Sequence, residues 1–270
     1  MSVSRRWALA GATAFVATGG SAPFGLAAQP KAAPQRRGRP TAPGAQRFLE
    51  LLIHHDEAKH TPYKAELAIP SGDTAWYAVD TLDVTKFRST NEAYRKRGYR
   101  LKRISVFKTR QGVRYSACWQ FAKGPDWHVV HGMTRASFDE KTASYMRNGY
   151  RMAHLDARAR YAAIWEKSDA VDQKIFSALG ADEFEQRCGE LSAQGYRPIR
   201  LSGGVADGAE HYAALFEPAG GTPWQARHRM DAQALRKAVA EMTRQGYRLV
   251  DASGHVQNGK PSFTGIWEQV

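Results

Sequence analysis

Apolar and polar residues alternate over short stretches of the chain, two of which carry a tryptophan, a histidine and a methionine in the same order. In an extended chain every second side chain points to the same face, so this alternation predicts a β-strand with one buried face. The two sets that would share a face are Trp127, Val129, His131 and Met133, and Trp224, Ala226, His228 and Met230.

A second pattern has the period of an α-helix. Mostly apolar residues recur at i, i+4 and i+7, which places them on one face of a helix. A glycine follows each stretch, and glycine can adopt the left-handed conformation that ends a helix without a Cβ clash. The four helical faces are Phe87, Asn91 and Tyr94; Phe138, Thr142 and Tyr145; Phe184, Cys188 and Leu191; and Leu235, Val239 and Met242.

These patterns belong to an internal repeat of roughly fifty residues. Each predicted helix ends in a glycine-tyrosine pair followed by arginine: Gly98 and Tyr99, Gly149 and Tyr150, Gly195 and Tyr196, and Gly246 and Tyr247. A tryptophan precedes three of the pairs at a constant distance, as Trp76, Trp127 and Trp224, and Gln173 takes its place in the third copy. A run of aromatic, small, small, aliphatic and aromatic residues follows each pair, at 115–119, 161–165, 212–216 and 263–267.

The aligned signatures predict an α+β fold of four tandem β-α-β-β repeats, in a curved, mostly antiparallel sheet with the helices packed on one side. Turns such as Gln111-Gly112 and Asn258-Gly259 would join the second and third strands as hairpins. The predicted repeats are residues 76–126, 127–172, 173–223 and 224–270, preceded by a capping half-unit at 45–75 and a flexible Pro- and Arg-containing linker at 29–44.

The N-terminus reads as a targeting segment. Arg5 and Arg6 precede an apolar stretch, Ala8 to Val16, and small residues follow around Ala28. This order predicts a twin-arginine-like signal peptide at 1–28, and hence an exported protein that is periplasmic or secreted. The apolar stretch is too short to span a bilayer stably, and we expect no integral membrane segment after its removal.

Three motifs of the repeat, Trp-x-Ala-Arg-His, Gly-Tyr-Arg and Tyr-Ala-Ala-Ile-Trp-Glu, resemble those of the bacterial tandem repeat family. Similar arrays form the N-terminal domain of the polyglycine hydrolases, and the resemblance covers about residues 64–270. In those hydrolases a separate β-lactamase-like serine hydrolase domain carries the chemistry, whereas this chain ends at Val270 after the fourth copy. The resemblance therefore implies a fold and a binding role, and not proteolysis.

The net charge of +13 suggests a nucleic-acid partner until the positions of the basic residues are considered. Six of them, Arg5, Arg6, Lys31, Arg36, Arg37 and Arg39, precede the repeats. The smaller excess in the repeats favours anionic surfaces only through nonspecific attraction, so we expect no specific nucleic-acid binding. Cys118 replaces an Ile or Leu of other copies and Cys188 lies on a buried helical face, which predicts two separate thiols, with one disulfide as the alternative.

Two motifs resemble catalytic or metal sites without completing them. Ser105 and Lys108 match Ser-x-x-Lys, but they fall in a predicted strand, whereas that chemistry requires the start of a helix. Residues 54–60 contain three histidines and two acids, yet lack the His-Glu-x-x-His spacing of a zinc site, so a solvated helix end is the preferred interpretation. We assign no catalytic residue, metal or cofactor.

His131 and His228 occupy one repeat position and are the candidate binding residues. The alternative is a half-buried histidine with a structural hydrogen bond, which recurrence favours because repeats preserve architecture. A cross-strand pair of arginine and carboxylate within each hairpin is also predicted. Its members are Arg100, Arg151, Arg197 and Arg248, opposite Gln120, Glu166, Glu217 and Glu268.

Together these features predict an exported, monomeric, non-catalytic binding module for a protein, a peptide or an envelope glycan. The first alternative is a cell-envelope hydrolase that uses His131 or His228 with a further partner. The second is a specificity subunit that works beside a separately encoded serine hydrolase, as the resemblance implies.

Overall fold

The computed structural model describes residues 76–169, 172–206 and 208–269. The predicted signal peptide, linker and capping half-unit lie outside the described residues, as does the cluster at 54–60. No helix in these described ranges is long and apolar enough to cross a membrane.

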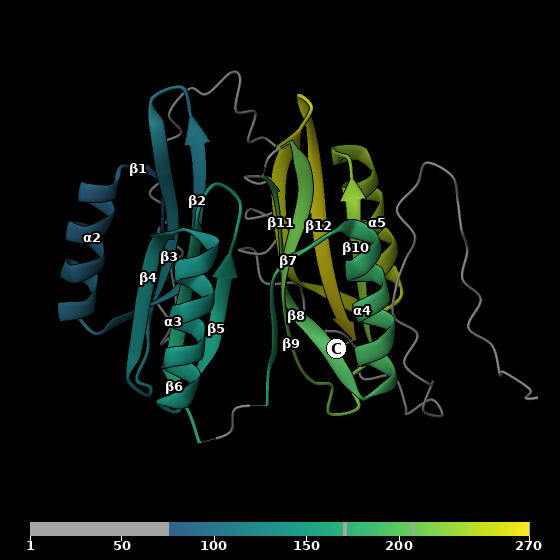
Figure 1. Cartoon of the computed structure of the whole chain (residues 1–270), viewed down its shortest axis with the longest axis horizontal. Helices are drawn as coiled ribbons and strands as arrows, with labels where there is room; N and C mark the ends of the chain where they lie inside the picture. Colours follow the sequence, from purple (N-terminus) through teal and green to yellow (C-terminus); the bar gives the residue numbers. More distant parts are fainter. Residues whose placement is uncertain (1–75, 170–171, 207, 270) are drawn as a thin grey trace, which may run out of the picture.

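The described chain is built from four successive β-α-β-β units, which confirms the predicted repeat (Figure 1). The first copy contains β1 (Trp76–Leu82), α2 (Val84–Lys96), β2 (Tyr99–Thr109) and β3 (Gly112–Phe121). The second contains β4 (Trp127–Met133), α3 (Arg135–Arg147), β5 (Tyr150–Asp156) and β6 (Tyr161–Lys167). The third contains β7 (Lys174–Leu179), α4 (Ala181–Ala193), β8 (Tyr196–Ala206) and β9 (Ala209–Pro218). The fourth contains β10 (Trp224–Met230), α5 (Ala232–Arg244), β11 (Tyr247–Gln257) and β12 (Lys260–Gln269).

Each copy forms its own three-stranded antiparallel sheet, in which the third strand lies between the first and the second. The prediction of one curved sheet is therefore wrong. The third strand uses both of its edges within its own copy. Neighbouring copies meet mainly through side chains, such as Asp156 and Ser202, which bind backbone groups of the preceding copy.

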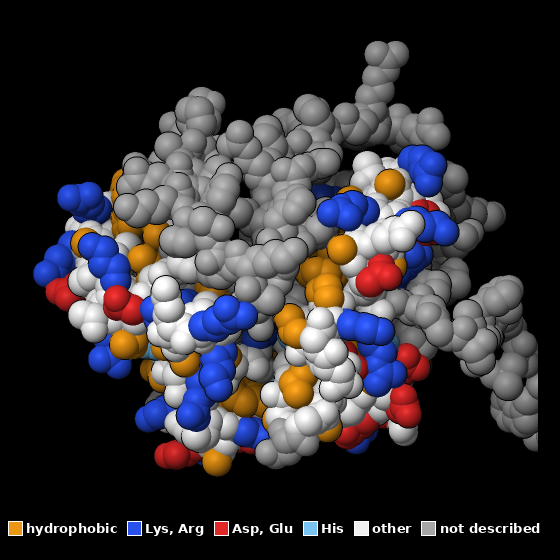
Figure 2. Space-filling model, turned by 90° about the horizontal axis from the view of Figure 1, so that it is seen from above, with side chains coloured by type: hydrophobic (Ala, Val, Ile, Leu, Met, Phe, Trp, Pro, Cys, Tyr) orange, Lys and Arg blue, Asp and Glu red, His pale blue; other side chains and the backbone are white. Residues whose placement is uncertain are grey.

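The first and second copies make up one half of the molecule, and the third and fourth make up the other (Figure 1). The second strands β2, β5, β8 and β11 lie toward the middle, where each contacts the next along the chain. Seen from above, Lys and Arg side chains are spread over the described part of the face and interspersed with Asp and Glu (Figure 2).

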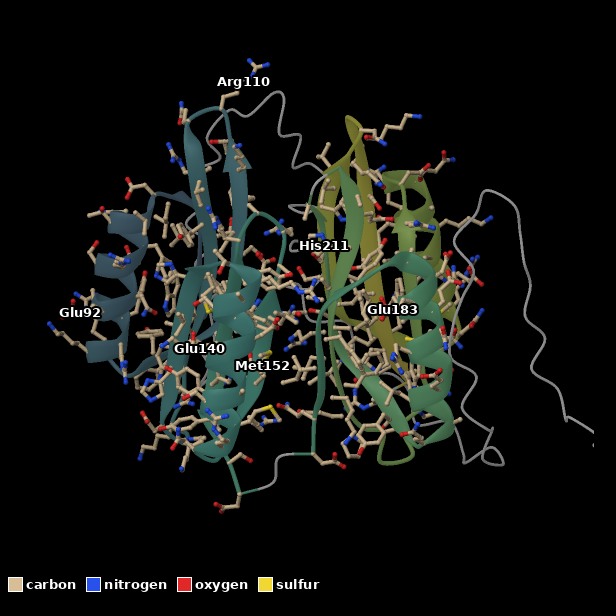
Figure 3. The ribbon with its side chains drawn as sticks, viewed as in Figure 1. Glu92, Arg110, Glu140, Met152, Glu183 and His211 are labelled. Atoms are coloured by element: carbon tan, nitrogen blue, oxygen red, sulfur yellow. The ribbon has the colours of Figure 1, made fainter. Side chains whose placement is uncertain are left out.

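The helices end before the predicted glycines, and their N-terminal caps are side chains of the preceding residues in three copies. Asp83, Thr134 and Asp231 cap three of them by accepting a hydrogen bond from a backbone N–H of the first turn. The glycines after the helices have φ between 74° and 86°, which any other residue adopts at a cost. On the solvent side, Glu92, Glu140 and Glu183 project from α2, α3 and α4 (Figure 3).

The predicted single face of the first strand is wrong in its second half. A register shift lies between Val130 and Met133, where Gly132 has a φ of 73°. As a result, Trp127 packs in the core of the first copy, while Met133 packs in the core of its own copy. The fourth copy repeats this division with Trp224 and Met230. The first strands β4 and β10 therefore each join two cores.

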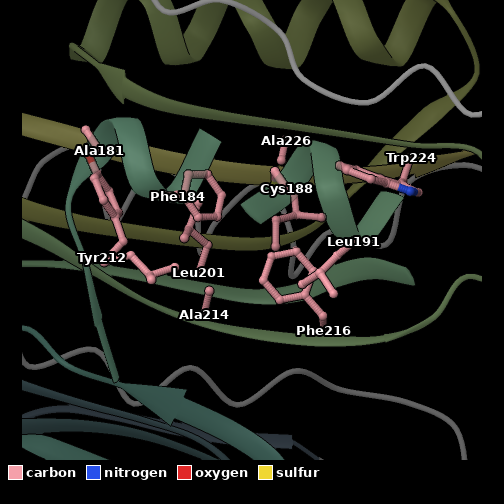
Figure 4. Close-up of a cluster of buried hydrophobic side chains, with 12 residues drawn as sticks. Ala181, Phe184, Cys188, Leu191, Leu201, Tyr212, Ala214, Phe216, Trp224 and Ala226 are labelled. Carbon is pink, nitrogen blue, oxygen red and sulfur yellow. The ribbon is translucent and has the colours of Figure 1, made fainter. Parts of the chain in front are cut away.

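The third strands of the second, third and fourth copies join copies in the same way. In β6 the side chains of Tyr161, Ala163 and Trp165 enter the core of the second copy. Ala162 and Ile164 alternate with them and enter the core of the first copy. The buried cluster in Figure 4 shows the next level of this arrangement, because Trp224 and Ala226 of the fourth copy pack among side chains of the third.

Both cysteines are free thiols, as predicted. Cys188 is buried in the core of the third copy and Cys118 is half-buried on β3. Burial raises the pKa of Cys188 to about 12 and that of Cys118 to about 11. Neither thiol is therefore a nucleophile near neutral pH.

Candidate binding groove

His131 and His228 are placed at two different junctions between copies. His131 packs edge-on against Phe87 and Tyr115 of the first copy, with ring centroids 4.9 and 5.1 Å apart. Its Nδ1 lies 3.2 Å from the Tyr115 hydroxyl. Burial lowers the pKa of His131, so the ring is neutral near pH 7.

His228 makes the corresponding contacts between the fourth and third copies. Its ring packs edge-on against Phe184 and Tyr212, at 5.5 and 5.3 Å between centroids. Nε2 donates to the Glu185 carboxylate over 2.9 Å. Burial lowers the pKa of His228, against the opposing effect of that carboxylate. The two histidines thus fill equivalent junctions and are not brought together.

A tryptophan accompanies the histidine at each of these two junctions. Trp127, 5% exposed, lies under the guanidinium groups of Arg95 and Arg100, which are 5.1 and 5.9 Å from the ring centroid. Trp224, 2% exposed, packs in the cluster that contains Cys188 and Leu191 (Figure 4). At the first and the last junction, therefore, an indole and an imidazole fill the space between a helix and the next sheet.

The middle junction, between the second and third copies, has neither ring. Gln173 stands in place of the tryptophan, and its amide is bound to the backbone: Oε1 accepts from Met152 N and Nε2 donates to Met152 O, both over 2.8 Å. The amide also donates to Glu217 over 2.6 Å. Ser177 stands in place of the histidine and accepts a hydrogen bond from Arg135 Nε over 3.2 Å.

A groove of about 470 Å³ runs along this junction between α3 and β7. Phe138, Thr142 and Met146 line it from the helix, Ile175 and Phe176 line it from the strand, and Gln173 lines it just before the strand. The Arg135–Ser177 hydrogen bond spans the junction at the N-terminal end of α3. Gln173 is smaller than the indole that it replaces, and its amide turns to the backbone of Met152, which leaves space at this junction. Ser177 lies at the same junction but is not among the residues that line the groove.

A second groove of about 500 Å³ lies at the C-terminal end of α3. It is more polar: Lys141, Asn148 and Lys167 border it together with Tyr145 and Tyr150. Lys167 donates to the carbonyl of Asn148 over 2.6 Å and lies 5.0 Å from the centre of the Tyr150 ring. Its polar groups are thus largely engaged with one another, whereas the α3–β7 groove presents mainly apolar side chains.

The sequence analysis missed a cluster of polar side chains along the second strands. Asp156 accepts a hydrogen bond from Val106 N over 2.8 Å, and Asp251 accepts one from Leu201 N over 3.1 Å. Arg103 reaches from the first copy to Asp251 of the fourth, at 2.7 Å. The signal was a polar residue at two positions in all four copies: Arg103, His154, Arg200 and Asp251, and Ser105, Asp156, Ser202 and Ser253.

These polar residues connect copies. Burial, with the nearby Arg200 and Arg103, holds the pKa of His154 well below its ordinary value, and Nε2 donates to Ile104 O over 2.8 Å. Burial also raises the pKa of Asp156, although Arg158 opposes that shift. His154, Asp156 and Asp251 each bind a backbone group of another copy, whereas the buried Ser253 hydroxyl has no hydrogen-bond partner among the described residues. The contacts between copies give the cluster a structural role.

The arginine–carboxylate pairs also connect copies, which corrects the prediction of a pair within each hairpin. Arg100 is 3.2 Å from Glu166, and Arg151 is 3.1 Å from Glu217. Arg197 pairs with Glu268 in the same way. In every case the carboxylate belongs to the following copy. Only Arg151 also approaches the carboxylate opposite it, Glu166, at 3.8 Å.

No complete catalytic constellation forms around the predicted candidates in the described ranges. Ser105 and Lys108 lie on β2, three positions apart on a strand, and so face opposite ways. His255 donates to the buried Glu210 over 3.1 Å, but the nearby Ser262 hydroxyl also binds that carboxylate, at 3.3 Å. Within the described residues there is no group of three or more His, Cys, Asp or Glu that could hold a metal ion.

Comparison with known families agrees with this division into copies. A family model described as a polyglycine hydrolase-like structural repeat matches residues 73–122, 124–168, 178–219 and 221–270. Each match falls on one β-α-β-β copy. No curated protein matches the sequence.

Proposed function

The chain belongs to the polyglycine hydrolase-like structural repeat family, and we propose that it is an exported recognition module without catalytic activity of its own. Its ligand is a peptide or a segment of a protein that lies in the groove between α3 and β7. The repeats provide the rigid frame, and the middle junction provides the site.

The observation that supports this proposal is the loss of both filling rings at a single junction. Trp127 and His131 close the first junction, and Trp224 and His228 close the last. The histidine position also differs in the first copy, as Asp80, but among the three junctions between described copies only the middle one lacks both rings. An apolar groove of several hundred Å³ with polar groups at its ends is typical of a ligand site.

Binding to envelope material tests the proposal. The exported protein is incubated with peptidoglycan, envelope protein fractions and a glycan array at low and high salt, and hydrogen exchange is followed. We expect saturable binding to a peptide or protein at both salt concentrations, with slower exchange in α3 and β7. Binding that disappears at high salt would reduce the interaction to net charge. Protection confined to other elements would contradict the assignment of the groove.

The family description supports a second candidate, a specificity subunit for a separately encoded serine hydrolase. A glycine-rich peptide in the binding panel examines this role. The subunit would lower the KM of such a hydrolase for the peptide and leave kcat unchanged. The hydrolase alternative makes a different prediction: the purified chain alone would release soluble fragments from peptidoglycan, and His228→Gln would abolish the release.

A further inference from the structure

We propose that the α3–β7 groove binds an aromatic side chain of indole size, presented by a partner peptide in the place that the chain's own tryptophan fills at the two other junctions. This inference rests on the proposed function and specifies what the site recognises. It commits to one occupant, a tryptophan-containing peptide segment.

The repeat itself shows which group fits. Trp127 pairs with Glu166 in its sheet, and His128 pairs with Trp165. In the third copy Lys174 pairs with Phe216, the residue equivalent to Trp165, so Gln173 holds the tryptophan position beside Glu217. At the first and last junctions the indole side chain at this position is almost completely buried. At the middle junction the shorter amide turns to the backbone of Met152 and leaves the place of the ring open.

The charge beside Gln173 is complementary to an aromatic face. Arg100 and Arg197, which belong to the junctions closed by tryptophan, have side chains 8% and 19% exposed. The equivalent Arg151 is 38% exposed and shares the carboxylate oxygen of Glu217 with Gln173. Trp127 covers the guanidinium of Arg100 at 5.9 Å, and a bound ring would cover Arg151 in the same way.

The walls of the groove suit an aromatic ring as well. Met146 replaces Arg95, which covers the indole at the first junction, and a thioether makes favourable contacts with aromatic rings. Phe138 stacks on Tyr161 with centroids 4.9 Å apart, without the imidazole that meets the equivalent pair elsewhere. The volume of about 470 Å³ accommodates one ring with the adjoining peptide backbone.

Methyl NMR on the whole exported chain tests the inference. The probe is the acetylated and amidated peptide Gly-Gly-Trp-Gly-Gly, and the reporter is the ¹³C-labelled methyl group of Met146. We expect a saturable shift of Met146, a smaller one with phenylalanine in place of tryptophan, and none with leucine. Met230, buried in the core of the fourth copy, serves as the internal reference and is expected to stay in place.

A variant in which a side chain of the protein fills the groove tests whether the peptide binds there. Gln173→Trp restores the ring of the repeat and is expected to weaken peptide binding by about tenfold or more. Gln186→Trp, at an exposed site on α4, adds the same ring elsewhere and should leave the affinity unchanged. Ser177→His, which restores the other ring of the repeat at this junction, provides a second variant if Gln173→Trp does not fold.

The outcomes separate this inference from the proposed function. A leucine peptide that shifts Met146 as strongly as the tryptophan peptide overturns the aromatic occupant. If Gln173→Trp abolishes binding of the envelope ligand but no peptide prefers tryptophan, the recognition module stands and the occupant is wrong. If both filled variants still bind the envelope ligand as the wild type does, the groove is not the site and both proposals fail.

Discussion

At the scale of single residues, equivalent positions in the four copies act as internal comparisons. The −7 position of the helix, counted from its glycine, is Asn91 in the first copy and Thr142 in the second. Asn91 accepts a hydrogen bond from the indole N–H of Trp119 over 2.9 Å. The corresponding Thr142 hydroxyl and Trp165 indole N–H have no hydrogen-bond partner in the described part of the chain. At the same repeat position, the first copy therefore makes a hydrogen bond to its tryptophan and the second copy does not.

This difference predicts opposite results for one substitution. Thr142→Val removes a hydroxyl that makes no hydrogen bond, so the free energy of unfolding should change by less than about 0.5 kcal/mol or rise. Asn91→Val leaves the Trp119 N–H buried without an acceptor and should cost about 1–3 kcal/mol. Urea unfolding of both variants measures the two values, and a larger loss for Thr142→Val would contradict the assignment.

His154 predicts a dependence of stability on pH. The folded protein holds this ring neutral, whereas the unfolded chain binds a proton with the ordinary pKa near 6.5. Stability is therefore lost as the pH falls below about 6.5, by about 1 kcal/mol for this residue at pH 5.5. His131, His211 and His228 have pKa values lowered by burial and add to the same trend.

The measurement compares wild type and His154→Gln in urea at pH 7.5 and 5.5. The variant should lose less stability over this interval, and its value at pH 7.5 separately reports the cost of the altered contact with Ile104. Equal losses in both proteins would show that His154 binds its proton equally well folded and unfolded.

At the scale of elements, the first and third strands of the second, third and fourth copies each divide their side chains between two cores. The sequence predicted which residues are apolar and on which element they lie, because those properties follow from local spacing. It did not predict that Ile164 packs against the preceding copy, since spacing within a copy does not identify the neighbouring surface. For the same reason, the sequence did not predict the bulge at Gly132 or the division into four separate sheets.

Two residues near the groove could be recognised in the sequence as exceptions to the repeat, but the repeat pattern did not predict a groove. Gln173 and Ser177 each depart from the repeat, and both departures are visible in the alignment. Only the placement of β7 against α3 shows that Gln173 lines a groove at this junction and that Ser177 lies at the same junction, bound to Arg135. The groove could be found only from the positions of these residues in space, and not from their types.

Removing a filling ring should weaken a junction. Trp224→Gln leaves a space in the core shared by the third and fourth copies, which should cost about 3 kcal/mol in the free energy of unfolding. Trp127→Gln repeats the experiment at the first junction, where the loss should be similar. Denaturant unfolding provides both values, and losses below about 1 kcal/mol would contradict the role of the rings in closing the junctions.

At the scale of the whole molecule, polar contacts along the second strands tie the first copy to the last. Asp251 of the fourth copy binds Arg103 of the first at 2.7 Å and lies 3.6 Å from Arg200 of the third. Its other carboxylate oxygen accepts from Leu201 N. One carboxylate thus links three copies, which a linear array with contacts only between neighbours would not do.

Asp251→Ala should accordingly destabilise the protein more than an ordinary surface change. It leaves two guanidinium groups and a backbone N–H without this partner, at an expected cost of about 3–5 kcal/mol. Glu92→Ala removes an exposed pair with Lys96 and should leave the melting temperature almost unchanged. Thermal unfolding of the two variants compares them, and similar melting temperatures would refute the special role of Asp251.

The tryptophan and the histidine at a junction also determine how many peptides one chain can bind, because together they close that junction. Three junctions offer three possible sites, and two residues decide whether each is closed or open. Trp224→Gln combined with His228→Ser would raise the stoichiometry from one bound peptide per chain to two, and Gln173→Trp would reduce it to none. A protein of this design can gain or lose avidity while its scaffold stays the same.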